Sequence, residues 1–152
     1  MPQIVIGAAM SETAHVYTRL RVWDGVAQAY LDGVDAIRVE RGVITALGTT
    51  TEISAGAEVR DMGGIAVVPG LIDAHVHMVL DPAVFDPLAQ ARGDAPTQLA
   101  AMARRADAMV RAGITTARDL GGGQWLELTL RDRIARGEIG RASCRERVYV
   151  LV

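Results

Sequence analysis

Residues 65–80 form a nearly uninterrupted apolar run, IAVVPGLIDAHVHMVL, in which β-branched side chains are frequent. Such a run is typical of a strand that is buried on both faces, as parallel strands usually are. The pair Pro69 and Gly70 interrupts the run, and proline cannot donate to a sheet, so the strand is predicted to begin at Leu71. This feature points to a parallel α/β architecture for the second half of the chain.

The residues after this run alternate between helix and strand patterns. A loop is predicted over 81–95, and Pro96 then suits a first helical position, followed by apolar residues at i, i+3 and i+4 spacing until Gly113. A short strand is predicted over 114–118, closed by Asp119, then a flexible loop over 121–123 and a second helix that ends at Gly137. Strand, helix, strand and helix in this order are typical of a parallel α/β unit.

The first half of the chain has a different pattern, in which short strands are separated by glycine turns. Strands are predicted over 16–23, 36–40 and 43–47, and Arg41 and Gly42 stand where a tight hairpin needs residues free to take positive φ. Residues 49–64 carry few bulky apolar groups and are interpreted as a linking stretch. We therefore expect a small antiparallel β unit that ends near Gly64.

Composition limits the partners and the chemistry. The chain of 152 residues contains 16 Arg and no Lys, and its formal net charge is −2, which gives no footprint for binding a polyanion such as nucleic acid. No uninterrupted apolar run approaches the roughly 20 residues of a membrane-spanning helix. A single cysteine, Cys144, excludes an internal disulfide and fits a reducing compartment, so a cytoplasmic protein is expected.

Side chains that can carry chemistry gather at Asp73, His75 and His77. Alternate strand residues point to the same face, about 6.6 Å apart, so two imidazoles at i and i+2 can converge on one metal ion, with Asp73 starting from the same side. Neutral imidazole is a good ligand for zinc and similar divalent cations. The alternative is a pair of ordinary strand histidines with satisfied ring nitrogens.

The segment VVPGLIDAHVH, which follows a glycine-turned β unit, resembles the start of the metal-dependent amidohydrolase superfamily, whose first barrel strand ends in this H-x-H pattern. VWDG, GVITALG and DMGGIAVVPGLIDAHVH also resemble segments of that superfamily. RAGITTARDLGG and LRDRIARGEIG resemble the branch that includes imidazolonepropionase-like proteins and prolidase-type dipeptidases. The resemblance covers about residues 16–140.

The resemblance implies a distorted TIM-like (β/α)8 barrel that carries one or two divalent ions at the carboxyl ends of its strands, beside a β-sandwich domain. Residues 1–64 would be part of the sandwich-type domain and residues 65–140 the start of the barrel. His75 and His77 match the first two metal ligands, and zinc is the expected ion. The implied reaction is hydrolysis by a metal-activated water of a carbon–nitrogen bond in a small molecule, such as a cyclic amide or a dipeptide, with a barrel aspartate managing the proton.

The sequence departs from the family pattern in its remaining ligands. In the family these are a lysine, two further histidines and an aspartate from later strands, whereas this chain has no lysine and only one other histidine, His15. An ion held by two histidines alone is two ligands short of a tetrahedral site, so we expect an N-terminal fragment with negligible catalysis on its own. Whether the protein forms a homo-oligomer is left open.

The tail RASCRERVYVLV also departs from the family, which would continue with a proline-containing turn into another barrel strand. We interpret residues 141–152 as a doubtful and non-native tail, in which the frame is lost at Arg141. The alternative is a genuine third strand, VYVLV, preceded by a basic loop. Sequencing the coding DNA beyond Gly140 distinguishes the two.

Two aspartates are further candidates for the site. Asp73 is expected to hold a ligand imidazole or brace the strand end rather than coordinate metal. Asp119 follows the second predicted strand, where it can shape the substrate pocket or orient a ligand, or else cap a helix or bond within a loop. Two alternatives to a truncated hydrolase stay open: a noncatalytic relative that serves as a binding or assembly module, and a small β protein with an unrelated α/β tail.

Overall fold

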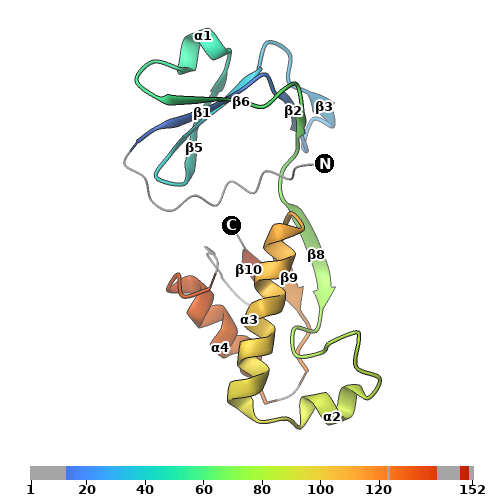
Figure 1. Cartoon of the computed structure of the whole chain (residues 1–152). Coiled ribbons are helices and arrows are strands. Elements are labelled where there is room, and N and C mark those ends of the chain that lie inside the picture. The colour runs from blue at the N-terminus through green and yellow to red at the C-terminus, as the bar shows by residue number, and fades with distance from the viewer. Residues whose placement is uncertain (1–12, 123, 140–147, 151–152) are drawn as a thin grey trace. The chain divides into compact units, whose positions relative to one another are not determined.

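The computed structural model describes residues 13–122, 124–139 and 148–150, and the chain divides into two compact units (Figure 1). We call the described residues up to Pro69 the β unit and those from Gly70 onward the α/β unit. The architecture is a mixed α/β one with several sheets.

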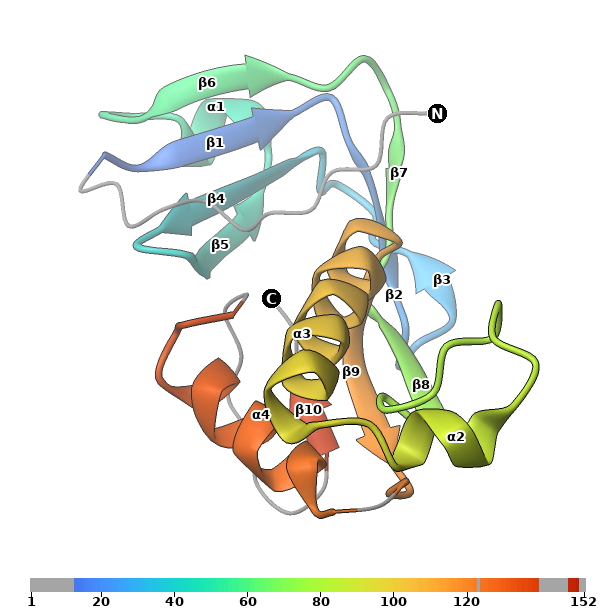
Figure 2. The same cartoon turned by 60° about the horizontal axis from the view of Figure 1, so that its bottom comes forward.

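The β unit contains a four-stranded sheet in the order β5-β4-β1-β6 and a smaller sheet in the order β3-β2-β7 (Figure 2). The strands are β1 (His15–Thr18), β2 (Arg21–Asp24), β3 (Ala29–Tyr30), β4 (Ala36–Glu40), β5 (Val43–Gly48), β6 (Glu58–Asp61) and β7 (Ala66–Val67). One short helix, α1 (Thr50–Ile53), follows β5. Val16, Ala36, Ile37 and Val39 are nearly inaccessible and form the centre of the larger sheet.

The predicted hairpin at Arg41 and Gly42 is confirmed, since both residues take positive φ, 49° and 77°, between β4 and β5. Three other expectations for this half are wrong. The predicted strand over 16–23 is two strands, because the chain turns at Arg19, which has a φ of 52°. The stretch 49–64 contains α1 and β6 rather than a plain link, and the sheet is mixed, because β6 pairs with β1 in parallel.

The α/β unit contains a three-stranded sheet in the order β10-β9-β8, with β8 parallel to β9 and β10 antiparallel to it. Helices α3 and α4 pack against each other, and α3 also packs on β9 (Figure 2). The elements are β8 (Leu71–Val76), α2 (Pro87–Ala91), α3 (Ala95–Arg111), β9 (Ile114–Asp119), α4 (Leu126–Ala135) and β10 (Val148–Val150).

The ends of α3 follow from local chemistry. Asp94 caps its first turn by accepting a hydrogen bond from the Thr97 N–H at 3.0 Å, and this bond holds the pKa of Asp94 below its usual value. Gly113, with a φ of 86°, ends the helix in the left-handed conformation that glycine tolerates. The predicted start of the helix near Pro96 and its end at Gly113 are therefore confirmed.

The core of the α/β unit lies between the sheet and the two longer helices. Met102 and Ala106 of α3 meet Leu130 and Ile134 of α4 and Ala117 of β9, all of them at most 1% exposed. Met78 and Val79, which follow β8, join the same cluster. Because Met78 and Val79 are buried, the residue before them, His77, is held at the edge of a packed core rather than on a free loop.

The β8–β9 pairing is irregular at two places. Thr115 is an extra residue on β9, since Leu71 pairs with Ile114 and Ile72 with Thr116. A Cβ at Gly70 would lie 2.0 Å from Thr115 Oγ1, so this position requires glycine. The second irregularity adds a residue to β8 between Asp73 and Val76, within the segment that carries His75.

β8 is not buried on both faces, contrary to the expectation from its composition. Leu71 and Ile72 are 55% and 72% exposed, because among the described strands β8 pairs only with β9 and lies at the edge of the sheet. Residues 140–147 and 151–152 lie outside the described part, so the proposed break at Arg141 is not visible. Residues 148–150 form a strand, β10, which runs antiparallel to β9 and so differs from a parallel barrel strand.

Within the described ranges, none of the helices has both the length and the apolar character needed to cross a membrane.

Candidate metal site

His75 and His77 lie at the carboxyl end of β8, His75 within the strand and His77 immediately after it. Both side chains are exposed to solvent. Their ring centroids are 5.3 Å apart and their planes are inclined by 73°. The two imidazoles therefore lie on the same side of the chain end, close enough to approach one ligand.

The hydrogen bond of His77 determines which of its ring nitrogens is free. Its Nδ1 lies within hydrogen-bond distance of the carbonyl oxygen of Gly121. Because a carbonyl only accepts, Nδ1 must carry the proton, and in the neutral ring the lone pair is then on Nε2. This tautomer leaves Nε2 as the atom of His77 that can bind a metal.

Asp73 contacts the main chain of the strand. Its Oδ1 accepts a hydrogen bond from the backbone N–H of His75 at 3.1 Å. This bond bridges the irregular part of β8, where an extra residue interrupts the ladder. Of the two expected roles, this hydrogen bond matches a brace for the strand end.

Asp119 is buried, at 1% exposure, at the end of β9. Its two carboxylate oxygens accept hydrogen bonds from the backbone N–H groups of Gly121, at 2.8 Å, and Met78, at 3.3 Å. Gly121 is the residue whose carbonyl bonds to His77, and Met78 follows His77 in the chain. Asp119 thus holds both backbone segments that flank this imidazole.

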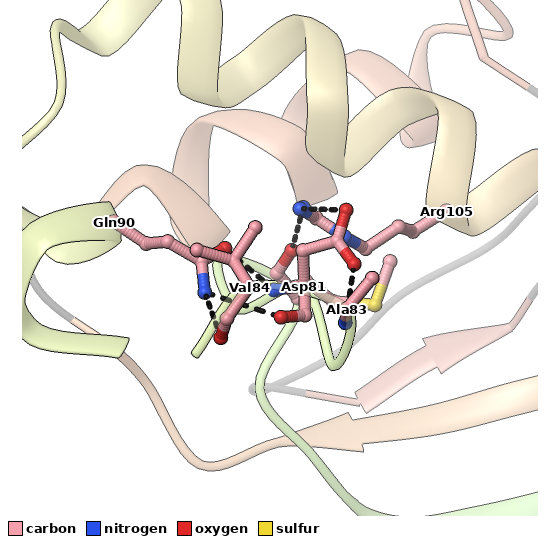
Figure 3. Close-up of polar contacts among 6 residues, drawn as sticks. Asp81, Ala83, Val84, Gln90 and Arg105 are labelled. Carbon is pink, nitrogen blue, oxygen red and sulfur yellow. Dashed lines mark hydrogen bonds and ion pairs between the residues drawn. The ribbon is translucent and has the colours of Figure 1, made fainter. Parts of the chain in front are cut away.

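A second network orders the segment that follows His77 (Figure 3). Arg105 of α3 donates to the Met78 carbonyl at 2.7 Å, and its guanidinium lies 3.7 Å from the Asp81 carboxylate. Gln90 of α2 closes the loop, because its side chain accepts from the Asp81 N–H at 2.8 Å and donates to the Asp81 carbonyl at 3.1 Å. The loop after β8 is therefore anchored to both neighbouring helices.

A shallow hollow of about 370 Å³ lies beside β8 and α3. It is lined by His77, Arg105 and apolar side chains that include Met78 and Met109, but by neither His75 nor Asp119. Since polar groups do not converge on it, we place the chemistry at the paired imidazoles instead.

The donor set fits the first part of a metal site. Two imidazoles bound at about 2.1 Å to a tetrahedral ion have ring centres roughly 5 Å apart, which agrees with the observed separation. Over residues 13–122, 124–139 and 148–150, no group of three or more His, Cys, Asp or Glu side chains is arranged to hold a metal ion. His15 belongs to the β unit, where its Nδ1 lies 3.5 Å from Glu58 Oε2.

The sequence pointed to His75, His77, Asp73 and Asp119 as candidate site residues, but it did not point to two residues that contact them or their neighbours, Gly121 and Arg105. Gly121 was expected to belong to a flexible loop, and its role depends on its carbonyl, which no side-chain pattern reveals. Arg105 stands on the helix face next to the buried Ala106, and only the tertiary structure shows that it reaches back to Met78. Gly121 itself, two residues after Asp119, is the one sequence signal that could have indicated a turn there.

Fold and site together define a class: α/β proteins with polar groups at the carboxyl ends of parallel strands, where α/β folds place their chemistry. Comparison with known proteins narrows this class. The model of the amidohydrolase family matches residues 66–136. An imidazolonepropionase from Deinococcus deserti is 42% identical over 57 residues, which are 36% of this chain and 14% of that protein.

Solved structures agree. The crystal structure of an amidohydrolase has a TM-score of 0.68 and 28% identity, and it covers 84% of this chain and 29% of that one. A prolidase complexed with N-methylphosphonate-L-proline has the same TM-score at 24% identity, covering 84% of this chain and 30% of that one, and shows the shared fold alone. These matches support a fragment of an amidohydrolase superfamily protein, and the chain spans less than a third of the length of these relatives.

Proposed function

We propose that this chain carries the first two metal ligands of a hydrolase that cleaves carbon–nitrogen bonds in small molecules. The observation that carries the proposal is the pair of imidazoles at the carboxyl end of β8, with centroids 5.3 Å apart and Nε2 of His77 left free. The match to the amidohydrolase superfamily, which is generally metal-dependent, supports it.

The proposed architecture is a partial β-sandwich-type domain over residues 1–64 followed by the first β/α units of a (β/α)8 barrel over residues 65–140. The parallel pairing of β8 with β9 and the helices that follow each strand support the barrel. A cytoplasmic location, and partners that include neither nucleic acid nor membrane, stay predictions.

His75 and His77 would hold the ion, with zinc as the expected metal. A divalent ion held there would supply Lewis-acid chemistry for hydrolysis, by acidifying a water molecule and polarising an amide-type carbonyl. The chain's own residues orient the ligands. The Gly121 carbonyl keeps the proton of His77 on Nδ1, Asp73 holds the backbone of His75, and Arg105 anchors the chain just beyond them.

For the substrate class we propose a cyclic amide or a dipeptide. The relative named imidazolonepropionase supports a cyclic amide. The described residues supply no third ligand and the whole sequence has no lysine, so we propose negligible turnover by the 152-residue chain alone. Turnover above background that a chelator abolishes would contradict this part.

The experiment is a zinc titration of the 152-residue chain by calorimetry. We expect one weak site, whose binding is lost in His75→Ala and in His77→Ala. His15→Ala is the matched control, because it removes the remaining histidine of the chain from the β unit, and it should bind as the unsubstituted chain does. Equal loss of binding in all three variants, or no binding by the original chain, would contradict the proposal.

The second candidate is a noncatalytic relative that serves as a binding or assembly module. The observation that favours it is the absence, over the described residues, of a group of three potential ligands. This candidate predicts a folded chain, self-associating or not, in which zinc uptake does not depend on His75 or His77. The same titration therefore separates the two.

A further inference from the structure

We propose that Asp119 is a positioning residue, whose buried carboxylate sets the tautomer of His77 through the Gly121 carbonyl. The role rests on the proposed metal function of His77, because a metal ligand needs a defined free nitrogen. Its geometry, however, stands on contacts within the protein alone.

The first step is the coupling between the two strand ends. Parallel strands bring their carboxyl ends to the same edge of a sheet, and Val76 of β8 pairs with Asp119 of β9. The Leu120 N–H donates to the Val76 carbonyl at 3.0 Å, which extends the ladder one residue beyond β9. Asp119 therefore stands beside the chain that leads into His77.

The second step is the use of both carboxylate oxygens. Oδ1 accepts from Gly121 N–H at 2.8 Å and Oδ2 from Met78 N–H at 3.3 Å. With 1% of its surface exposed, Asp119 has little water to replace these donors. A carboxylate is suited to this place, since it is an acceptor at both oxygens, whereas an asparagine amide would turn an NH₂ donor toward one of the two N–H groups.

The third step is the orientation of Gly121. Its φ of 84° lies in the left-handed region, which turns the chain sharply after β9. The next residue, Gly122, has no room for a side chain, because a Cβ there would lie 2.0 Å from Val79 Cγ1. The turn is thus held at its N–H by Asp119 and packed closely at the following residue, and its carbonyl is directed at His77 Nδ1.

The consequence is a relay in which each contact sets the next. Asp119 holds Gly121, the Gly121 carbonyl keeps the proton on Nδ1 of His77, and Nε2 is left with the lone pair. Hydrogen-bond partners of metal-bound histidines fix the tautomer and ring orientation in this way. Asp73 accepts a hydrogen bond from the backbone N–H of the neighbouring histidine, His75, so it supplies a matched control.

The test is long-range ¹H–¹⁵N NMR of the histidine rings in the metal-free 152-residue chain, at a pH where the imidazoles are neutral. We expect His77 to be the Nδ1–H tautomer in the original chain and in Asp73→Asn, and to lose this preference in Asp119→Asn. An Nε2–H tautomer in the original chain, or an unchanged His77 in a folded Asp119→Asn, would overturn the proposal.

If Asp119→Asn does not fold, Gly121→Ala decides, because alanine strains the left-handed φ of 84° and is expected to turn the carbonyl away from His77 while Asp119 is retained. An unchanged His77 tautomer in that variant would equally overturn the relay. A zinc competition assay then links the relay to the proposed function, with an expected loss of affinity of roughly 10- to 100-fold in Asp119→Asn. If the original chain shows the expected tautomers but binds no zinc, the proposed function fails and the positioning role stands.

Discussion

Two strands of this protein end in the same local motif, an aspartate followed two residues later by a glycine with positive φ. β6 ends at Asp61, whose Oδ1 accepts from the Gly63 N–H at 2.8 Å, and β9 ends at Asp119, whose Oδ1 accepts from the Gly121 N–H at 2.8 Å. The φ values of the glycines are 68° and 84°. The local geometry is shared, so any difference in role comes from the surroundings.

The surroundings differ in burial and in the second partner. The Asp61 side chain is 55% exposed and pairs with Arg19 at 2.6 Å, an exposed ion pair of a kind that contributes little to stability. Asp119 is buried, and its second partner is the backbone of Met78, beside His77. The comparison teaches that a strand-end aspartate becomes part of a site when packing removes water and an imidazole lies within reach of the turn.

The largest effect should follow removal of the buried carboxylate. Asp119→Ala leaves two backbone donors at the strand ends without their acceptor, so we expect the α/β unit to lose about 3 kcal/mol of its free energy of unfolding. Asp61→Ala should cost the β unit much less, because water replaces the exposed carboxylate.

The two tryptophans allow each unit to be followed separately in denaturant unfolding. Trp23 lies in the β unit and Trp125 in the α/β unit, so Trp23→Phe and Trp125→Phe backgrounds each leave one fluorescent reporter. Equal losses for the two alanine variants would show that burial does not distinguish the two turns.

An intermediate effect is expected for the glycines. Gly63→Ala and Gly121→Ala each place a Cβ on a left-handed residue, at a cost of about 1 to 2 kcal/mol. Neither Cβ meets a close neighbour, since Gly63 has nothing within 4 Å and Gly121 only Glu127 Oε1 at 3.7 Å. The two variants should therefore lose similar stability, while only Gly121→Ala alters the NMR signals of His77. Altered signals in Gly63→Ala would break the distinction.

A related prediction concerns the loop after His77. Arg105→Met keeps an apolar side chain of similar length but removes the donor to the Met78 carbonyl and the charge near Asp81. We expect a loss of about 1 kcal/mol in the α/β unit and faster hydrogen exchange at the amides of Asp81 and Ala83. Unchanged exchange at both amides would show that Gln90 alone anchors the loop.

The smallest effect is the pH dependence at Asp61. The hydrogen bond from Arg19, followed by that from the Gly63 N–H, holds the pKa of Asp61 below its ordinary value of 3.8. The folded carboxylate is thus favoured, so its contribution is present above pH 3.8 and is lost as the pH falls through the lower folded pKa.

Acid unfolding of the β unit, followed through Trp23, checks this. The stability difference between the original chain and Asp61→Asn should shrink below pH 3.8 and should also shrink in concentrated salt, because the pair is exposed. A difference that grows as the pH falls would contradict the assigned direction.

Much of the chain could be predicted where strong local signals exist. The start of β8 at Leu71 follows from Pro69 and Gly70, and the end of α3 follows from Gly113. The missed elements are short ones. Helix α1 has four residues and is held by a capping box between Thr49 and Glu52, and β6 exists because β1 offers it a partner. Such pairings depend on tertiary contacts that a periodicity pattern does not contain.

The features of the candidate site likewise separate into those that the sequence predicts and those that it does not. The imidazoles could be predicted from their spacing and from the family resemblance, and Asp119 from its place after a strand. The irregular residue in β8, the exposure of Leu71 and Ile72, and the carbonyl of Gly121 could not, because they depend on which strands pair and where the backbone turns.

The most direct measurement of the central claim is a zinc titration observed through the ring nitrogens of all three histidines by ¹⁵N NMR. We expect the signals of His75 and His77 to change together, with the largest change of His77 at Nε2, while those of His15 stay constant. Unchanged His75 and His77 rings at saturating zinc, or a response at His77 through Nδ1, would contradict a shared metal site at the end of β8.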